Sequence, residues 1–463
     1  MLTIQEAAAA LRARRLSSRE ITETALALAQ RLQPKLNTFI TLTAESALQR
    51  ASALDADLAK GIDHGPLHGL PIAHKDCFYT KDVLTTDGSR LFGGFIPDHD
   101  AAVVERLHAA GAVSLGKLNM HELAYGITSQ NEHFGGVRNP WDLEAIPGGS
   151  SGGSGAAVTT GILFCGTGTD TGGSVRIPAS YCGATGLKTT FGRVSRYGCF
   201  ALAPSFDTMG PLTRTVRDTA LCYAAMAGYD ERDPVSCRKP VEVPAFTPEA
   251  RLDGVRIGLA VNFFNERVDP AVLAAVEAMA QVAASAGATV VKVRVPDMLA
   301  LNAATLTVQL AESSTTFAAQ RDRWHEVGSL PRPILERGLT ISAVDYLLAQ
   351  QTIARFRLEF AAIWQHCDCL FAPSTPVAAP KIGQNALSFD GVEEEVRIAT
   401  TRLQRGVNAL GLPALAQPCG AAPDGRPYGL QIIGAPFTES ELLRIGAAIE
   451  DRTAFHLRHP SVF

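Results

Sequence analysis

Two loops of the sequence carry residues that could perform nucleophilic chemistry on a carbonyl group. Residues 147–155 read PGGSSGGSG and run directly into an apolar, helix-like stretch. Residues 168–179 read GTDTGGSVRIPA and place paired glycines before Ser174. Glycines let backbone N–H groups converge on one point, as in an oxyanion hole built from main chain. A flexible Gly/Ser linker is the alternative for the first loop, but a linker has no reason to continue into a helix.

A candidate base lies upstream of both loops. Lys75 ends the short apolar segment 71–75. A lysine that leaves water finds its charged form disfavoured, and the neutral amine can then accept a proton at neutral pH. A base and a hydroxyl cradled by main-chain donors are the parts that nucleophilic catalysis needs.

Several competing motifs fail on inspection. Residues 148–152 match the G-x-S-x-G elbow of α/β-hydrolases, but that elbow follows a strand, and residues 139–147 cannot form one. The dinucleotide-binding fingerprint breaks at Thr171, and the P-loop motif is absent from the sequence. His121 has no second histidine four residues later, which excludes a metalloprotease helix. Residues 367–369 hold two cysteines without the spacing of a zinc site.

Composition bounds the class of protein. The 463 residues are 46% hydrophobic and carry a formal net charge of -4, which predicts a globular chain and argues against nucleic-acid binding. Nine scattered cysteines, an odd number, predict reduced thiols. The sequence has no apolar run of about 20 residues, as a membrane span requires. The first helix-like segment is charged, unlike a secretory signal, so we expect a cytoplasmic enzyme.

The elements that position these loops alternate between helix and strand. Such alternation predicts an α/β architecture with a large, at least partly parallel sheet. Ser17-x-x-Glu20 has the pattern of a capping box at a helix start. Residues 231–252 form the best linker candidate and are expected to cross the surface. The expected helices are 4–16, 18–60, 100–111, 270–286 and 439–451, and the expected strands are 112–116, 255–261, 288–295 and 428–433.

The segment from Gly65 to about Asp230 strongly resembles the amidase signature family. The resemblance rests on GLPIAHKD at 69–76, GGSSGGS at 148–154 and DTGGSVR at 170–176. NALGLP at 408–413 and YGLQIIG at 428–434 are similar to the family's closing elements, so the resemblance covers nearly the whole chain and is weakest between about 235 and 370.

The resemblance implies a single amidase signature domain of the α/β class, over residues 1–463. Its large mixed β-sheet is covered by helices on both faces. Within it, residues 1–60 are the N-terminal helices, 65–235 the catalytic core, and 236–463 the remainder of the sheet with the helices of the substrate entrance.

The resemblance also implies amide hydrolysis through a Ser-Ser-Lys triad. Ser174 is then the acyl nucleophile, and Ser150, which follows a cis peptide bond in the family, relays its proton to Lys75. The backbone N–H groups of Thr171, Gly172, Gly173 and Ser174 would hold the oxyanion. This mechanism uses no metal or organic cofactor. The expected partners are a small-molecule amide and water, with no nucleic acid and no membrane. A homodimer is expected on a separate ground, because two-fold pairs are the commonest assemblies.

Neighbouring residues have supporting or substrate-binding roles in this interpretation. Asp170 and Arg176 are expected to pair or to bond backbone near the site, and Ser151 to bond local backbone. Tyr125, Gly126 and Thr128 fall where the family's acyl pocket is lined.

The identity of the amide leaves alternatives open. The chain is also similar to the glutaminase subunit of the tRNA-dependent amidotransferase, including FGRVSRYG at 191–198. A glutaminase needs a cation, ideally arginine, for the α-carboxylate of glutamine. Arg332 and Arg337 stand in a proline-interrupted stretch out of register, so we predict a stand-alone amidase acting on small apolar or aryl amides, with esters or carbamates as further substrates. The alternative is the glutaminase subunit, which works with partner subunits. A non-enzymatic scaffold has little support, since all three triad residues are present.

Overall fold

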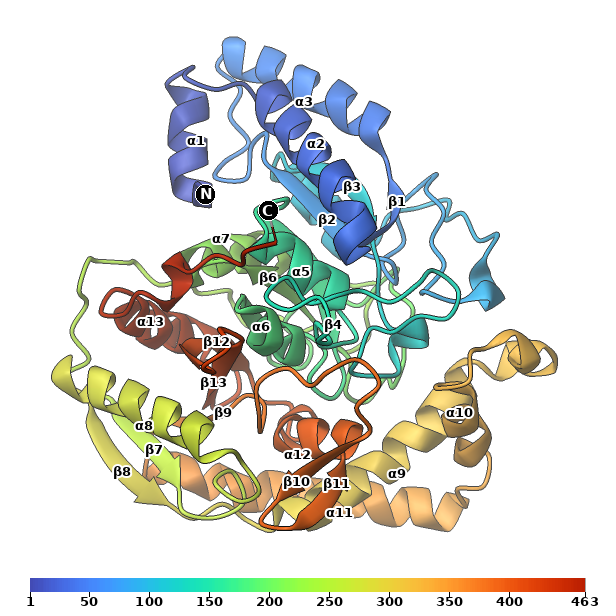
Figure 1. Cartoon of the computed structure of the whole chain (residues 1–463), viewed down its shortest axis with the longest axis vertical. Coiled ribbons are helices and arrows are strands. Elements are labelled where there is room, and N and C mark those ends of the chain that lie inside the picture. Colours follow the sequence, from blue (N-terminus) through green and yellow to red (C-terminus); the bar gives the residue numbers. More distant parts are fainter. Residues whose placement is uncertain (463) are drawn as a thin grey trace.

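One mixed sheet runs through the molecule (Figure 1). The computed structural model describes residues 1–462. A separate two-stranded sheet joins β10 (Ala386–Phe389) and β11 (Val392–Glu395). The main sheet has 11 strands in the order β1 (Phe39–Leu42), β3 (Val113–Leu118), β2 (Pro71–Lys75), β4 (Cys165–Asp170), β6 (Thr208–Thr213), β5 (Thr185–Lys188), β12 (Ala414–Ala421), β13 (Pro427–Gly434), β9 (Cys369–Pro373), β7 (Arg256–Ala260) and β8 (Thr289–Val293).

The strands run in both directions. β2 pairs in parallel with β3 and with β4, and β7 pairs in parallel with β8 and with β9. Between these two parallel groups, β6, β5, β12 and β13 pair only antiparallel with their neighbours. The predicted large mixed sheet, part of it parallel, is therefore confirmed.

Helices cover both faces of this sheet. Leu415 and Ala416 are neighbours on β12, so their side chains point to opposite faces. Leu415 packs in the cluster that holds residues of α7, α8 and α13, whereas Ala416 packs with residues of α5 and α6. The helices are α1 (Ile4–Arg12), α2 (Ser18–Leu36), α3 (Ala44–Ala59), α4 (Ala102–Ala109), α5 (Gly152–Thr159), α6 (Arg176–Cys182), α7 (Val216–Met226), α8 (Pro270–Ser285), α9 (Met298–Thr316), α10 (Arg332–Gly338), α11 (Ala343–Ala361), α12 (Val396–Ala409) and α13 (Glu439–Glu450).

The N-terminal region differs from its prediction. Residues 18–60 do not form one helix. α2 starts at the predicted capping box, where Ser17 and Glu20 bond reciprocally, and it ends where Asn37 adopts a left-handed conformation with φ 53°. Asparagine tolerates this conformation and often ends helices. The chain then pairs Phe39 with Leu118 as strand β1 before α3 begins.

Most other predicted elements agree with the structure within one or two residues. α1 is shorter than expected and ends at Arg12. The linker candidate 231–252 contains no helix or strand and is mostly exposed or half-buried. None of the helices within residues 1–462 combines the length and apolarity that crossing a bilayer requires.

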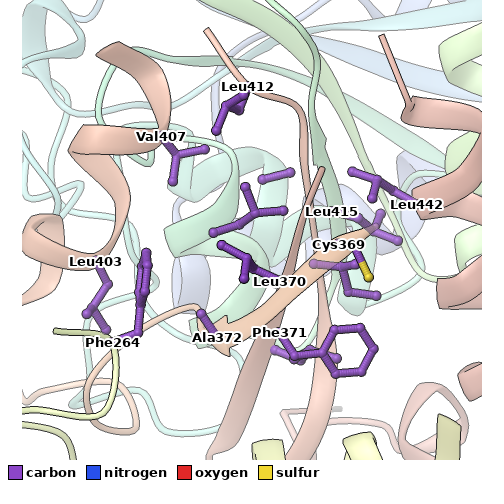
Figure 2. Packing of buried hydrophobic residues seen from close by; sticks show 14 of the residues in the cluster. Phe264, Cys369, Leu370, Phe371, Ala372, Leu403, Val407, Leu412, Leu415 and Leu442 are labelled. Carbon is purple, nitrogen blue, oxygen red and sulfur yellow. The ribbon is translucent and has the colours of Figure 1, made fainter. Parts of the chain in front are cut away.

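The largest apolar cluster surrounds β9 (Figure 2). Leu370 on this strand points to the side of Leu403 and Val407 on α12, whereas its neighbour Cys369 points to the side of Leu415 on β12 and Leu442 on α13. β9 is buried along its whole length, since its neighbours β13 and β7 lie on both sides and helices cover its faces. This cluster fixes α12 against the sheet, and α12 reaches the site described below.

We predict that Leu370→Ala lowers the free energy of unfolding by about 2–5 kcal/mol, because truncating a buried leucine loses apolar contacts and leaves a cavity. Leu358→Ala is the matched control, since Leu358 is 78% exposed on α11 whereas Leu370 is 1% exposed. Urea unfolding of both variants measures the difference. Equal midpoints for the two variants would contradict the packing described here.

Candidate active site

Lys75 and Thr169 meet at the end of two parallel strands. Lys75 is the last residue of β2, and Thr169 lies near the end of β4, which pairs with β2 in parallel. Their side chains are hydrogen-bonded, with Lys75 Nζ donating to Thr169 Oγ1 at 2.6 Å. Carboxyl ends of parallel strands share one edge of a sheet, so the topology itself brings these groups together.

Lys75 also reaches the Gly/Ser-rich loop. Its Nζ donates to Ser150 Oγ at 2.7 Å, and both side chains are fully buried. The Gly149–Ser150 peptide bond is cis, as the resemblance implies. Gly148 has φ 83°, and a Cβ there would lie 2.8 Å from Pro178 Cα, so the loop requires glycine at this position. Among the salt bridges within residues 1–462, none involves Lys75.

Ser174 lies in the loop between β4 and α6. This loop touches the Ser150 loop, because Ser151 N–H donates to the Ser174 carbonyl oxygen at 3.3 Å. Ser174 is 8% exposed, whereas Lys75 and Ser150 are 0% exposed. The hydrogen bonds within residues 1–462 join Lys75 to Ser150 but include none between the Ser150 and Ser174 hydroxyls. Catalytic hydrogen bonds are often long without substrate and tighten in the reactive complex.

One of the four expected oxyanion donors is already engaged. Gly173 N–H donates to Asp170 Oδ1 at 2.8 Å, so this donor is occupied in the structure. The N–H groups of Thr171, Gly172 and Ser174 have no partner in the described part of the chain. The hydrogen bond from Gly173 N–H to Asp170 fixes the conformation of the loop.

A buried ion pair supports the Ser174 loop. Arg176 donates to both carboxylate oxygens of Asp170 at 3.0 Å, and both side chains are 0% exposed. Burial alone would raise the pKa of Asp170, but the Arg176 guanidinium outweighs it and holds the pKa well below its ordinary value. Asn408 Nδ2 donates to Asp170 Oδ1 at 2.8 Å, and Arg176 donates to Gln431 Oε1 at 3.2 Å. The closing motifs of the sequence, at 408–413 and 428–434, therefore support the loop that carries Ser174.

The hydroxyls next to Ser150 bond backbone. Ser151 Oγ donates to the Thr169 carbonyl at 3.4 Å, which is the local role predicted for it. His121 N–H donates to the Ser150 carbonyl at 3.0 Å. Thr128 Oγ1 lies 3.3 Å from His121 Nδ1, so Thr128 contacts the residue that supports Ser150. Thr128 is not among the residues that line the cavity at Ser174.

A small cavity opens at Ser174. Tyr125 and Gly126 line it, as predicted. Sequence reasoning missed Gln309 on α9 and Arg397 and Arg405 on α12, which also line it. Residues 397, 401 and 405 recur every four positions, which places them on one face of a helix, and this spacing is the signal that could have found them. Arg332 and Arg337 do not line this cavity, whereas Arg397 and Arg405 do.

Comparison with known proteins shows the class of enzyme. A family model described as Amidase matches residues 20–443, and the chain belongs to this family of carbon–nitrogen hydrolases. It is 41% identical to a glutamyl-tRNA(Gln) amidotransferase subunit of Methylococcus capsulatus, covering 99% of this chain and 98% of that protein.

Solved structures agree with this assignment. One, described as a vestigial protein complex that reveals the evolutionary origins of an s-triazine catabolic enzyme, matches with a TM-score of 0.93 and 36% identity over 97% of this chain and 98% of that one. The peptide amidase of Stenotrophomonas maltophilia matches with a TM-score of 0.85 and 30% identity over 99% and 98% of the two chains.

We predict that Asp170→Asn lowers the free energy of unfolding by about 3–5 kcal/mol, because Arg176 would keep its charge in a buried place without a counterion. Asp253→Asn is the control, since Asp253 pairs with Arg251 at 2.7 Å on the exposed surface. Chemical denaturation of both variants tests this. An Asp170→Asn protein as stable as the control would show that the pair does not hold the loop.

Proposed function

We propose that this protein hydrolyses a carboxylic amide through an acyl-enzyme on Ser174. The observation that carries the proposal is the buried hydrogen bond from Lys75 to Ser150, beside a loop that presents Ser174 to a cavity. Lys75 makes no salt bridge within residues 1–462. As an amine, Nζ can accept the Ser150 proton through the same contact.

The proposed proton path runs inward from the cavity. Ser174 Oγ attacks the amide carbon as its proton passes to Ser150 Oγ, while the Ser150 proton passes to Lys75 Nζ. The relay then returns a proton to the leaving nitrogen, and the C–N bond breaks to release the amine. Water attacks the ester on Ser174 by the same path and releases the carboxylic acid. The Ser150–Ser174 hydrogen bond of this relay forms when substrate is bound.

Main-chain donors stabilise the oxyanion in this proposal. The N–H groups of Thr171, Gly172 and Ser174 are unpaired within residues 1–462 and lie on the loop that carries the nucleophile. Each donor of this kind contributes about 3 kcal/mol to lowering the barrier. Asp207 accepts a hydrogen bond from Thr171 Oγ1 at 2.5 Å, which fixes the first of these residues.

Ser174→Ala is expected to reduce turnover of a small amide by at least about 10⁴-fold, since removing a covalent nucleophile disables the whole triad. Lys75→Met should have nearly the same effect. Ser285→Ala at the exposed end of α8, where the hydroxyl donates to the Val282 carbonyl at 2.7 Å, is the control and should keep full activity. Ammonia release measures turnover, and a fluorophosphonate that labels serine should modify wild type but not Ser174→Ala. Retained activity in Ser174→Ala would refute the assignment.

A second candidate is the glutaminase subunit of an amidotransferase. The relatives favour it, since full-length matches at 38–41% identity include several proteins named as glutamyl-tRNA(Gln) amidotransferase subunits. Such a protein would deliver ammonia from glutamine to a partner's reaction. The stand-alone amidase needs no partner subunit.

A hydrolysis assay of the purified chain, with and without partner subunits, distinguishes the two candidate functions. A stand-alone amidase is expected to hydrolyse non-glutamine amides at the same rate with or without amidotransferase partner subunits. The glutaminase subunit is expected to show negligible hydrolysis alone and glutamine-dependent ammonia release once those partners are added. A panel of primary amides, aryl amides and glutamine, scored by kcat/KM in both conditions, provides the measurement.

A further inference from the structure

Arg405 is a buried arginine without a counterion. It is 7% exposed and lines the cavity at Ser174. Its one hydrogen bond within residues 1–462 goes to Thr401 Oγ1 at 2.9 Å, and its Nε has no partner. Burial lowers the pKa of Arg405 to about 10, so the guanidinium is still charged at neutral pH. A buried charge without a partner is costly, which makes it unusual unless a ligand supplies the counterion.

Other buried arginines of the protein are well partnered. Arg176 is paired with Asp170, as described above. Arg402, also on α12, donates to the carbonyls of Phe263, Glu266 and Arg267. Arg405 lies one turn away from Arg402 on the same helix. In the described part of the chain, however, it has neither a carboxylate nor a carbonyl partner.

Other buried polar groups around Arg405 also lack a hydrogen-bond partner in the described part of the chain. Gln309 Oε1 and Tyr125 Oη are buried, line the same cavity and have no hydrogen bond within residues 1–462. Arg397 adds a second positive charge at the cavity and is partly balanced by Glu395 at 3.1 Å. None of the lining residues in the described part of the chain is acidic. The cavity therefore offers positive charge and hydrogen-bond donors to a small anionic group.

We infer that Arg405, with Gln309 and Tyr125, binds a carboxylate at the far end of the substrate's acyl group. The inference rests on the proposed function, because it places that carboxylate in the cavity where the acyl group is bonded to Ser174. The guanidinium and the Tyr125 hydroxyl donate to the carboxylate, and the Gln309 amide can turn to present its NH₂ group. The cavity has a volume of about 30 Å³, which favours short acyl chains.

The same surroundings discriminate against an amino acid. Glutamine and asparagine carry an α-ammonium group beside the carboxylate, and this group needs an acceptor or a negative charge. The cavity has positive charges on Arg397 and Arg405 and no acidic lining residue among those described. An ammonium group placed there is repelled. The preferred substrates are therefore amides of dicarboxylic acids that lack the α-amino group.

Three amides of nearly equal size test this inference. Succinamate carries the carboxylate, succinamide replaces it with a neutral amide, and asparagine adds the α-ammonium group. Wild type is expected to hydrolyse succinamate with a kcat/KM at least about 100-fold above that of succinamide or asparagine, from a charge-assisted contact that the other two lack or offset. Glutaramate, glutaramide and glutamine repeat the test with one more methylene group.

Variants assign the preference to Arg405. Arg405→Gln is expected to lower kcat/KM for succinamate by about 100-fold and to bring its ratio to succinamide close to one. Arg405→Lys should restore part of that ratio. Arg355→Gln is the control, since Arg355 lies on the exposed surface of α11 and pairs with Glu359 at 3.2 Å. Equal rates for succinamate and succinamide in wild type, or equal losses on both in Arg405→Gln, would overturn the inference.

A binding measurement separates this inference from the proposed reaction. Succinate, the product anion, should protect Ser174 of wild type from the fluorophosphonate. About 100-fold more succinate should be needed in Arg405→Gln, and an intermediate concentration in Arg405→Lys. Protection by succinate with no amide turnover would keep the carboxylate site and reject the reaction. Turnover lost in Ser174→Ala, with no protection by succinate and no preference for succinamate, would keep the reaction and reject the carboxylate site. If Arg405→Gln fails to fold, the measurements on wild type and Arg405→Lys still test the inference.

Discussion

The ion pair between Asp170 and Arg176 is the constraint on which the site depends. Asp170 ends strand β4 and accepts from Gly173 N–H, while Arg176 begins α6, so the pair closes the loop that carries Ser174 at both ends. Arg176 also donates to Asn408 Oδ1 at 2.6 Å, on α12. One buried pair thus joins the nucleophile loop to the helix that presents Arg405. In the proposed function, chemistry and substrate selection therefore share a single support.

The sequence predicted the class of enzyme better than the lining of the cavity. Lys75, Ser150 and Ser174 lie in compact motifs whose glycines have visible reasons, such as the close approach of Gly148 to Pro178. The alternation of helix and strand likewise predicted the large, partly parallel sheet. The break at Asn37 was missed because a left-handed residue and a pairing with distant β3 end the helix there, and neither leaves an apolar signal.

The lining of the cavity could not be predicted in the same way, because it comes from segments that lie far apart in the sequence. Tyr125, Gln309 and Arg405 lie far apart in the sequence and converge only when α9 and α12 pack beside the nucleophile loop. Arg332 and Arg337, the arginines singled out in the sequence, lie on α10, and neither lines the cavity. The charge of the pocket therefore depends on helix packing, which residue spacing alone does not reveal.

Burial is graded along the three proposed catalytic residues in a way that suits the roles proposed for them. Lys75 and Ser150 are sealed from solvent, and Ser174 alone of the three lines the cavity. In the proposed function the sealed interior holds the base, while the cavity at Ser174 admits substrate and the water that releases the acyl group. Arg405 lines the same cavity as Ser174, so in the proposed function a substrate that pairs with Arg405 lies beside the nucleophile.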